Sequence, residues 1–495
     1  MRAALLLCLA GCAAATSTPA VITRPNPGLE SAPTKPASAV QVRSLPAELD
    51  VDPATLAPTA PLDFAIREPE VVKLSNGVPV YLMVDRTTPL VLLRALMPLG
   101  SVDDPADKVG LVSLMTSLLS EGGAGTRTPQ QLEELLDSRA ADLSSGAGDE
   151  TSTATLSMRR EDLPLLVPVF ADVLQRPRFD DQRFDVLKTR FIESVKRRED
   201  RPDAVAGRAI SKAIFGPDSL LAREATEASL KAITVGDLKK LHESGWGSKG
   251  ARLIVTGDFD RAALLALLEK NFGSWKGGVA PARKWPKPPA LTARLIVVPR
   301  KVAQAKVRIG TWGYQRATPQ EYPLRLLATG LGAFGVGRLY KEIRDERGLA
   351  YSANAGANGG PTTGSFIASF DTRPEQVGEA LDVALRILNE AGAGAPLNST
   401  ELRTAQDMAV NAFAFRFDSA ARIALDRAQY DLLGYPPDYL STWRAKMAAV
   451  RESDAKSAAA ALTGLQIVIV GPPDKLGDLS RFGSVVTIND VEQFK

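Results

Sequence analysis

The 495-residue chain is poor in the residues that most often bind metals or form covalent cross-links. It contains one histidine, His242, and two cysteines, Cys8 and Cys12. A single histidine cannot supply a zinc site that needs two imidazoles. Charge of one sign is also lacking, since 60 basic and 57 acidic residues leave a net charge of +3 without a Lys/Arg-rich run. Nucleic acid is therefore not expected as a partner.

The two cysteines lie in an N-terminal segment that has the features of a secretion signal. A basic residue and a short apolar stretch precede Leu9-Ala10-Gly11-Cys12, which resembles the lipobox of bacterial lipoproteins. We expect residues 1–12 to be the signal peptide, with Cys12 becoming the lipidated first residue of the mature chain. The mature chain would then have no second thiol and no disulfide. The expected location is periplasmic and lipid-anchored, at the outer membrane rather than the inner one. An ordinary cleaved signal with a chance cysteine is the alternative.

The remaining sequence divides by composition into a tether and two folded regions. Residues 13–61 are rich in Ala, Pro, Ser and Thr, which favours an extended tether between membrane and folded body. A Gly/Pro/Lys-rich stretch at 276–292 has the composition of a linker. It separates an N-terminal domain at 62–275 from a C-terminal domain at 293–495. A chain of this length and 45% hydrophobic content is too long for a single core.

The order of expected elements is similar on the two sides of the linker. Asn76-Gly77 predicts a tight turn between strands 71–74 and 78–84, and a further strand follows at 90–97. Helices are expected at 109–119, after the Thr128 capping box, and in long stretches at 162–200 and 203–215. Strands at 295–298 and 306–311 and a helix start at Thr318 follow the linker. The terminal strands of the two domains end at Gly257 and Gly471, 214 residues apart. The chain is therefore predicted to be α+β, with two homologous α/β domains, each a mostly antiparallel sheet packed with helices.

One segment carries a clear family resemblance. The string Arg338 to Ser352, RLYKEIRDERGLAYS, together with LSNG before a strand and PLGSVDDP before a Gly-Leu helix, resembles the pitrilysin/insulinase family of zinc peptidases. The resemblance covers about residues 71–488 and is strongest to two-domain members such as the mitochondrial processing peptidases. It implies that the chain forms half of a clamshell-shaped peptidase.

The resemblance also shows what this chain has lost. Active relatives carry His-x-x-Glu-His on the Gly-Leu helix, and the matching positions here are Ser113, Thr116 and Ser117. The third zinc ligand of the family matches Glu193, 76 residues after Ser117. His242 lies on another expected helix and is interpreted as a surface residue. A lone carboxylate does not make a useful zinc site, so no metal or other cofactor is expected in this chain.

The second domain keeps the other half of the family's active site. Active relatives place an Arg and a Tyr seven residues apart to hold the substrate backbone, and Arg344 and Tyr351 match them. Such donors suit a peptide carbonyl on which negative charge develops. The alternative is a surface ion pair for Arg344 and strand packing for Tyr351. The stretch Gly330 to Gly337 matches G-x-G-x-x-G but follows a helix-like segment, so we interpret it as a loop rather than a dinucleotide site. The resemblance implies substrate contacts by Gly335 and Gly337.

The resemblance also suggests where peptide would bind. The family's substrate-binding edge strand matches Leu143, Ser144, Ser145, Gly146 and Ala147. The leading hypothesis is a zinc-free subunit, inactive alone, that binds unfolded peptide beside a paralogous partner carrying His-x-x-Glu-His and the zinc. A stand-alone peptide-binding or assembly lipoprotein is the alternative. A hydrolase using Ser113 or Ser117 as nucleophile lacks both a nearby histidine and a Gly-x-Ser-x-Gly turn.

Overall fold

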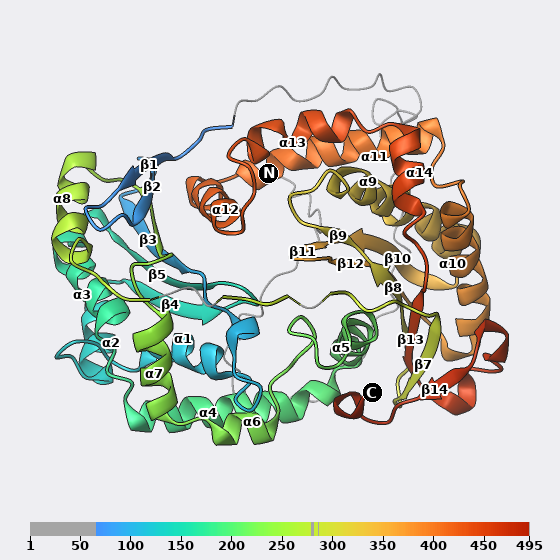
Figure 1. Cartoon of the computed structure of the whole chain (residues 1–495), viewed down its shortest axis with the longest axis horizontal. Coiled ribbons are helices and arrows are strands. Elements are labelled where there is room, and N and C mark those ends of the chain that lie inside the picture. The colour runs from blue at the N-terminus through green and yellow to red at the C-terminus, as the bar shows by residue number, and fades with distance from the viewer. Residues whose placement is uncertain (1–65, 279–281, 286, 495) are drawn as a thin grey trace, which may run out of the picture. The chain divides into compact units, whose positions relative to one another are not determined.

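The computed structural model describes residues 66–278, 282–285 and 287–494, which belong to one compact unit. The predicted signal peptide, the lipidated Cys12 and the predicted tether lie outside the described residues. Two six-stranded sheets, each packed with helices, form the framework (Figure 1). This mixed arrangement confirms the predicted α+β class. No described helix is both long and apolar enough to cross a bilayer.

The first sheet has the order β1-β2-β6-β3-β5-β4, and all its neighbouring pairs are antiparallel except β2 with β6. The predicted Asn76-Gly77 hairpin is confirmed, since Gly77 has φ +86° and Val72 faces Val80. The strands are β1 (Glu70–Lys73), β2 (Pro79–Val84), β3 (Leu90–Met97), β4 (Asp142–Ala147), β5 (Ser152–Arg159) and β6 (Arg252–Gly257). The helices are α1 (Leu111–Glu121), α2 (Pro129–Ser138), α3 (Leu163–Gln175), α4 (Asp181–Arg197), α5 (Pro202–Phe215), α6 (Glu227–Ala232), α7 (Val235–Gly245) and α8 (Arg261–Phe272).

The second sheet has the order β10-β12-β8-β13-β7-β14, and β9 and β11 form a separate short pair. Its strands are β7 (Arg294–Pro299), β8 (Ala305–Trp312), β10 (Ala350–Ala357), β12 (Ser365–Thr372), β13 (Gln466–Gly471) and β14 (Val485–Thr487), beside β9 (Tyr314–Gln315) and β11 (Gly359–Gly360). The helices are α9 (Glu321–Gly332), the π-helical η6 (Tyr340–Glu346), α10 (Val377–Gly392), α11 (Ser399–Ala412), α12 (Ala420–Leu432), α13 (Tyr439–Ala448) and α14 (Glu452–Ala459).

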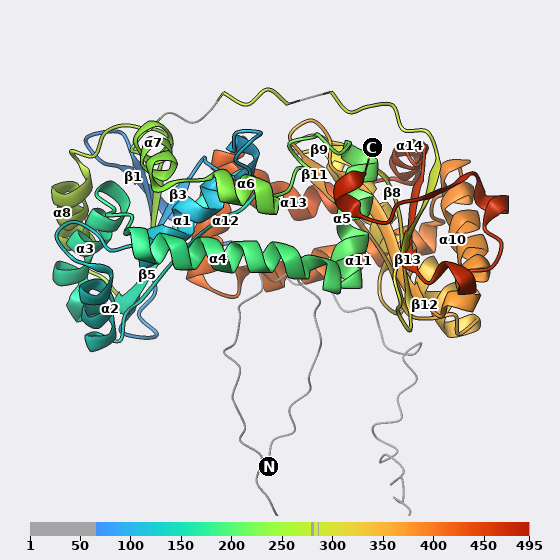
Figure 2. The same ribbon diagram turned by 90° about the horizontal axis from the view of Figure 1, so that it is seen from below.

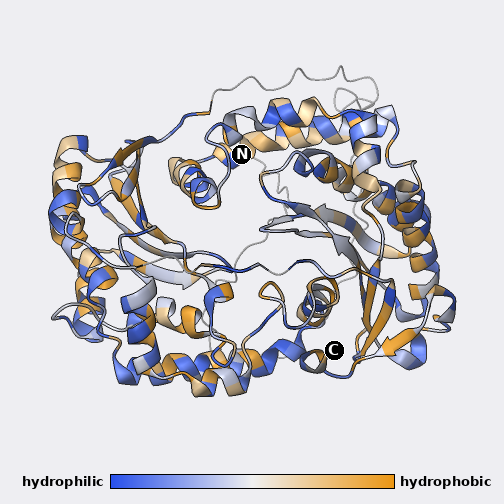
Figure 3. Ribbon diagram, viewed as in Figure 1, coloured by the Kyte–Doolittle hydropathy of each residue, from blue (hydrophilic) through white to orange (hydrophobic). Residues whose placement is uncertain are grey.

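The two sheets repeat one pattern of pairing. Read from the edge, β4-β5-β3-β6-β2 and β10-β12-β8-β13-β7 have the same sequence of three antiparallel pairs followed by one parallel pair. The sixth strands differ, because β1 pairs antiparallel with β2 whereas β14 pairs parallel with β7. Strands β4 and β10 therefore hold equivalent edge positions. In Figure 3 the apolar strand β7 is orange, whereas β10, built mostly of small residues, is pale.

One helix from each half packs on the sheet of the other half. Helix α5 contacts β8 and β13, where Val205, Ala209 and Ile210 join a buried cluster with Val298 and Val468. In the opposite direction, α12 contacts β2 and β6. Figure 1 shows α5 beside β13 and α12 beside β2, and Figure 2 shows α4 leading into α5. This exchange follows from tertiary packing and has no signal in the local sequence.

Some helix starts differ from those expected. The capping box at Thr128 is confirmed, and a second one is found at Thr234; each hydroxyl accepts from a backbone N–H three residues on. Helix α9, however, begins at Glu321, and Thr318 instead donates its hydroxyl to the Gln315 carbonyl at 2.5 Å. The pattern Thr-Pro-Gln-Glu thus forms a turn before the helix, because the Thr318 hydroxyl is used by the residues that precede it.

The turns at the ends of the two edge hairpins are both fastened by residues 314–316. Strand β9 pairs with β11, which lies between β10 and β12. Next to it, Arg316 binds the carboxylate of Glu150, between β4 and β5, through two bonds of 2.7 and 2.6 Å. Arg283 also approaches Glu150 and binds Asp103. Residues 314–316 therefore contact the turns of both edge hairpins, one through strand pairing and the other through a largely buried ion pair.

Candidate functional site

Helix α1 carries the three positions where active relatives have zinc ligands and the general base. It packs against β4 and α4, and its stripe of buried residues includes Leu114, Met115 and Leu118. Thr116 is fully buried, and its hydroxyl donates to the Val112 carbonyl at 2.8 Å. Ser113 and Ser117 are half-buried. Serine and threonine hydroxyls are not among the zinc ligands that such a site uses. These residues do not fit the family's metal.

Glu193 lies on α4, as expected, but its carboxylate is occupied. It accepts a hydrogen bond from Lys196 Nζ at 3.0 Å, one turn along the same helix, and its side chain is 49% exposed. This bond raises the pKa of Lys196. Glu193 is thus a salt-bridged helix residue. Among the described residues, no group of three or more His, Cys, Asp or Glu could hold a metal ion.

The single histidine is packed rather than exposed, which corrects the prediction of a surface residue. The Nε2 atom of His242 lies 2.9 Å from the Leu174 carbonyl. Its ring stacks on Trp246 and meets the edge of Phe179, with centroid distances of 6.4 and 5.6 Å. Burial lowers the pKa of His242. The position on a helix was predicted, and Trp246 lies only four residues further along the chain. Phe179 comes from a distant segment and has no local sequence signal.

The N-terminus of α1 is held by a carboxylate that the sequence reasoning missed. Asp104 accepts from the backbone N–H groups of Gly110 and Val112, both at 2.7 Å. The side chain is buried, and desolvation raises the pKa of Asp104 to about 6. A usable signal was present, since Asp104 belongs to the PLGSVDDP segment that precedes the Gly-Leu helix. Asp104 therefore fixes how α1 enters the fold.

The predicted substrate strand is the edge strand β4. It pairs with β5 in unbroken antiparallel register from Asp142 to Ala147 and has no second neighbour among the described strands. Ser145 donates its hydroxyl to the Thr116 carbonyl at 2.6 Å and lies 2.9 Å from the Ser120 hydroxyl. The edge is therefore bound to α1, with a regular row of backbone groups along its outer side.

The second predicted pair, Arg344 and Tyr351, is brought together at the other edge. Arg344 lies in η6, and its Cζ is 5.1 Å from the centroid of the Tyr351 ring at the start of β10. The β10–β12 register shifts between Ala350 and Ala353, so Tyr351 stands at a bulge and is 80% exposed. The nearest carboxylate to the guanidinium is that of Asp345, at 4.0 Å, and no described residue bonds to the Arg344 or Tyr351 donors. The alternative of a surface ion pair is thus present as this contact with Asp345, beside the contact with the Tyr351 ring.

Two aromatic residues missed from sequence complete the surroundings of Arg344. Its Cζ lies 4.8 Å from the Tyr340 ring and 5.6 Å from the Phe334 ring. Phe334 stands in the glycine-rich stretch and is 76% exposed. A large apolar residue in a stretch expected to be a loop was an available signal. We call Phe334, Tyr340, Arg344 and Tyr351 the aromatic–arginine cluster.

The glycine-rich stretch is only partly a loop, which corrects the prediction for 330–337. Gly330 and Gly332 are buried in the last turn of α9, and a Cβ on Gly332 would lie 1.9 Å from the backbone nitrogen of Ala355 in β10. Glycine is needed there because the helix and strand approach so closely. The loop itself contains Gly335, with φ +77° and open space around it, and Gly337, which donates to the Ala333 carbonyl.

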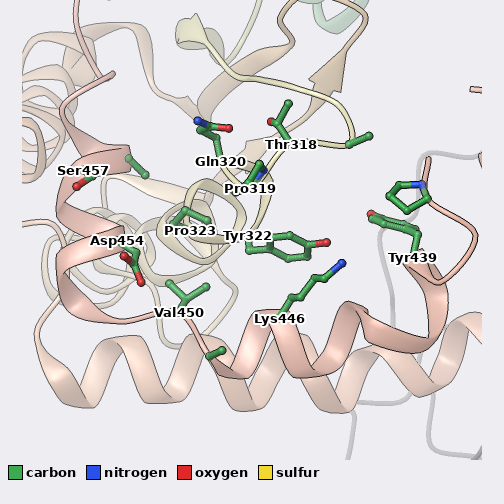
Figure 4. Close-up of a pocket in the computed structure, with 14 residues that line it drawn as sticks. Thr318, Pro319, Gln320, Tyr322, Pro323, Tyr439, Lys446, Val450, Asp454 and Ser457 are labelled. Atoms are coloured by element: carbon green, nitrogen blue, oxygen red, sulfur yellow. The ribbon is translucent and has the colours of Figure 1, made fainter. Parts of the chain in front are cut away.

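A separate cavity of about 710 Å³ lies elsewhere in the C-terminal half (Figure 4). Tyr322, Tyr439 and Lys446 point toward one another in it, with Lys446 Nζ 5.9 Å from the Tyr322 ring centroid. The described residues that line it include no residue of the candidate site. The cavity is therefore distinct from the two edges.

Two protein-family models match the sequence of this chain. Insulinase (peptidase family M16) matches residues 80–223, and the peptidase M16 inactive domain matches residues 232–408. Together they cover well over half of the chain. The chain belongs to the insulinase family, peptidase family M16. This M16 chain is thus peptidase-like, and its C-terminal half resembles a domain described as inactive.

Individual relatives support the family and the fold. An uncharacterized zinc protease of Mycobacterium bovis is 26% identical over 295 residues, or 58% of this M16 chain and 67% of the relative. One of Bacillus subtilis is 23% identical over 280 residues, or 56% and 67% of the two chains. A peptidase M16 inactive domain from Pseudomonas fluorescens has a TM-score of 0.72 at 21% identity, covering 82% and 98%. A protease from Helicobacter pylori has a TM-score of 0.73 at 18% identity, covering 82% and 100%. At these identities the structures show the fold alone.

Proposed function

We propose that this M16 chain is the zinc-free subunit of a heterodimeric metallopeptidase. In this proposal it binds unfolded peptide and presents Arg344 and Tyr351 to the active site of a paralogous partner. The partner carries His-x-x-Glu-His and the zinc, and this chain alone is inactive. The observation that carries the proposal is the Arg344–Tyr351 pair. Arg344 Cζ lies 5.1 Å from the Tyr351 ring centroid, and no described residue accepts a hydrogen bond from the side-chain donors of either residue.

The geometry of the pair suits a peptide carbonyl. Arg344 contacts its neighbours through the faces of aromatic rings, so its N–H groups, which lie in the guanidinium plane, stay available. The Tyr351 hydroxyl is on a largely exposed ring. Donors placed beforehand stabilise a carbonyl oxygen most when it becomes anionic. We expect these two residues to lower the barrier of the partner's reaction rather than to tighten ground-state binding.

The first half would supply the peptide grip without chemistry. Strand β4 offers the regular outer edge to which an extended peptide can add by main-chain hydrogen bonds. Ser113, Thr116 and Ser117 replace the ligands and the base, so this half would hold substrate and leave the reaction to the partner. Main-chain pairing depends little on sequence, which suits unfolded chains as substrates.

Isolation and reconstitution of the complex test the proposal. The tagged mature chain should co-purify with a His-x-x-Glu-His paralogue from the native host. Neither chain alone should cleave an unfolded fluorogenic peptide at the rate of the mixture, and zinc should be found only in the partner. Chelator-sensitive cleavage with one zinc per chain in the isolated protein would overturn the proposal.

A stand-alone peptide-binding or assembly lipoprotein is the second candidate. The free β4 edge supports it equally, because strand addition needs no partner subunit. Among the structures of similar fold is a chain of complex III2 from Candida albicans, with a TM-score of 0.68 at 17% identity over 83% of this chain and 98% of that one. Peptide binding by the isolated chain, with no paralogue recovered and no stimulation of any peptidase, would favour this candidate.

The proposed attachment to the outer membrane rests on Cys12. Replacing Cys12 by Ala should leave the protein unlipidated and shift it from the membrane to the periplasmic fraction, because the mature chain has no other lipidation site of this kind. The variant should be assayed by fractionation in a strain without the partner. Unchanged membrane association there would contradict lipid anchoring at Cys12.

A further inference from the structure

Phe334 is an exposed apolar ring that the fold does not need for its core. It is 76% exposed and stands in the turn between α9 and η6. Its ring lies 4.8 Å from the centroid of the buried Tyr340 ring and 5.6 Å from Arg344 Cζ. Isolated exposed apolar residues are common, but Phe334 and Tyr351 are both exposed and both contact one guanidinium. Together they form an exposed aromatic surface.

The local backbone projects this surface outward. The positive φ of Gly335 and the bond from Gly337 N–H to the Ala333 carbonyl, at 2.8 Å, make a tight turn that carries Phe334. On the other side, the bulge after Ala350 takes Tyr351 out of the β10–β12 ladder. The buried Tyr340 contacts the same guanidinium, with its ring centroid 4.8 Å from Arg344 Cζ.

We infer that the aromatic–arginine cluster is a side-chain subsite that selects peptides with an aromatic or large apolar residue. The inference rests on the proposed function, since the selected side chain belongs to the residue beside the carbonyl that Arg344 and Tyr351 hold. An aromatic side chain can stack on Phe334 and Tyr351 and remove both rings from water. A basic side chain would meet the positive charge of Arg344. Phe334 is the specificity-determining residue of the subsite.

The charges around Arg344 do not favour an acidic ligand as the main one. Asp345, the nearest carboxylate, is half exposed beside the guanidinium, and Glu342 lies in the same helix. An acidic side chain would gain Arg344 but approach Asp345. Burial of the rings is the larger gain, because two large side chains are open to solvent at one place.

Peptide binding by the mature full-length chain tests the subsite. Fluorescent, unstructured peptides should differ only at one central position, occupied by Phe, Leu, Ala, Glu or Lys, and their Kd values should be measured by anisotropy. For the wild type we expect the Phe peptide to bind about five- to tenfold more tightly than the Ala peptide, the gain of one aromatic pair. Phe334→Ala should remove this difference while leaving the Ala peptide unchanged, and Phe334→Tyr should retain most of it.

Phe415→Ala is the matched control. Phe415 is 70% exposed, in a segment outside the cluster, so its loss changes a similar surface without changing the subsite. Thermal unfolding should show that all variants keep the fold. A preference for the Glu peptide, or an aromatic preference that survives Phe334→Ala, would overturn the subsite and leave the proposed function standing. Failure of every peptide to bind the wild type would overturn both peptide binding and the subsite.

Discussion

The edge strands β4 and β10 hold equivalent positions in two sheets of the same topology, yet they present different groups. Strand β4 is regular, and the hydroxyl of Ser145 is tied to the helix beneath it. Strand β10 begins with a bulge and carries the exposed Tyr351 beside Arg344. The first edge offers main-chain groups and the second offers side chains. In the proposed function, the first edge binds peptide and the second recognises a carbonyl group.

The helices under the two edges differ in the same sense. Helix α1 starts at a buried carboxylate, Asp104, which accepts two backbone N–H groups. Helix α9 starts at Glu321, its N-cap residue Gln320 makes no side-chain cap, and its last turn packs on β10 through Gly332. Specific contacts therefore fix the start of α1 and the end of α9. Only the end of α9 leads directly into the loop that carries the exposed Phe334.

The largest expected effect comes from removing the donors at the β10 edge. In the reconstituted complex, Arg344→Ala and Tyr351→Phe should each lower kcat by about 10²–10³, or roughly 3–4 kcal/mol, with a smaller change in KM. The reason is that the donors act mainly on the developing oxyanion. Steady-state kinetics with separate kcat and KM values provides the measurement.

Two matched variants control for loss of structure. Arg347→Ala removes an arginine three residues along, which pairs with Glu379 at 3.7 Å, and Tyr322→Phe removes a hydroxyl in the separate cavity. Both should keep full activity and complex formation. Full activity in Arg344→Ala and Tyr351→Phe would leave this chain a structural partner only, and the difference between the two edges would have no catalytic meaning.

A smaller effect is expected from the carboxylate under the β4 edge. The pKa of Asp104 is raised from 3.8 to about 6, so the folded state binds a proton more tightly than the unfolded state between these values. Stability from this group is therefore largest below pH 4 and is lost as the pH rises toward 6. Relative to Asp104→Asn, the wild-type free energy of unfolding should fall by about 2–3 kcal/mol between pH 4 and pH 7.

Urea unfolding of both proteins across this pH range gives the difference directly. Subtracting the variant removes the contributions of other titrating groups that are common to both. A difference that stays constant with pH, or that favours the wild type as the pH rises, would contradict a raised pKa at Asp104. No side-chain carboxylate caps the start of α9, so this pH dependence is expected from the cap of α1 and not from α9.

The sequence predicted the parts of this comparison that depend on local patterns. The Asn76-Gly77 turn, the edge segment 143–147 and the spacing of Arg344 and Tyr351 follow from residue types at fixed offsets. The exchange of α5 and α12 and the contact of His242 with Phe179 depend on segments far apart in the chain. The rings around Arg344 all come from the segment between Phe334 and Tyr351, but their contacts depend on how that segment folds. Gly330 and Gly332 were expected in a loop but lie in the last turn of α9, where Gly332 packs closely on Ala355. Local patterns therefore identified the candidate site residues but not all of the contacts around them.

The smallest expected effect tests whether the β4 edge binds peptide through the main chain. In an added strand, alternate peptide N–H groups face the protein edge, so two peptides N-methylated at alternate amides in opposite phase differ only in which N–H groups are blocked. The phase that blocks edge-facing groups should weaken binding about five- to thirtyfold for two lost hydrogen bonds, and the other phase should bind like the unmodified peptide. Anisotropy gives the affinities, and a photo-crosslinking residue in the tight-binding peptide should label 143–147 rather than 353–357, because the bulge in β10 interrupts a regular ladder. Equal affinities for both methylated peptides would mean that peptide is held by side chains alone. Labelling of β10 would mean that peptide binds at the edge that also carries Arg344 and Tyr351.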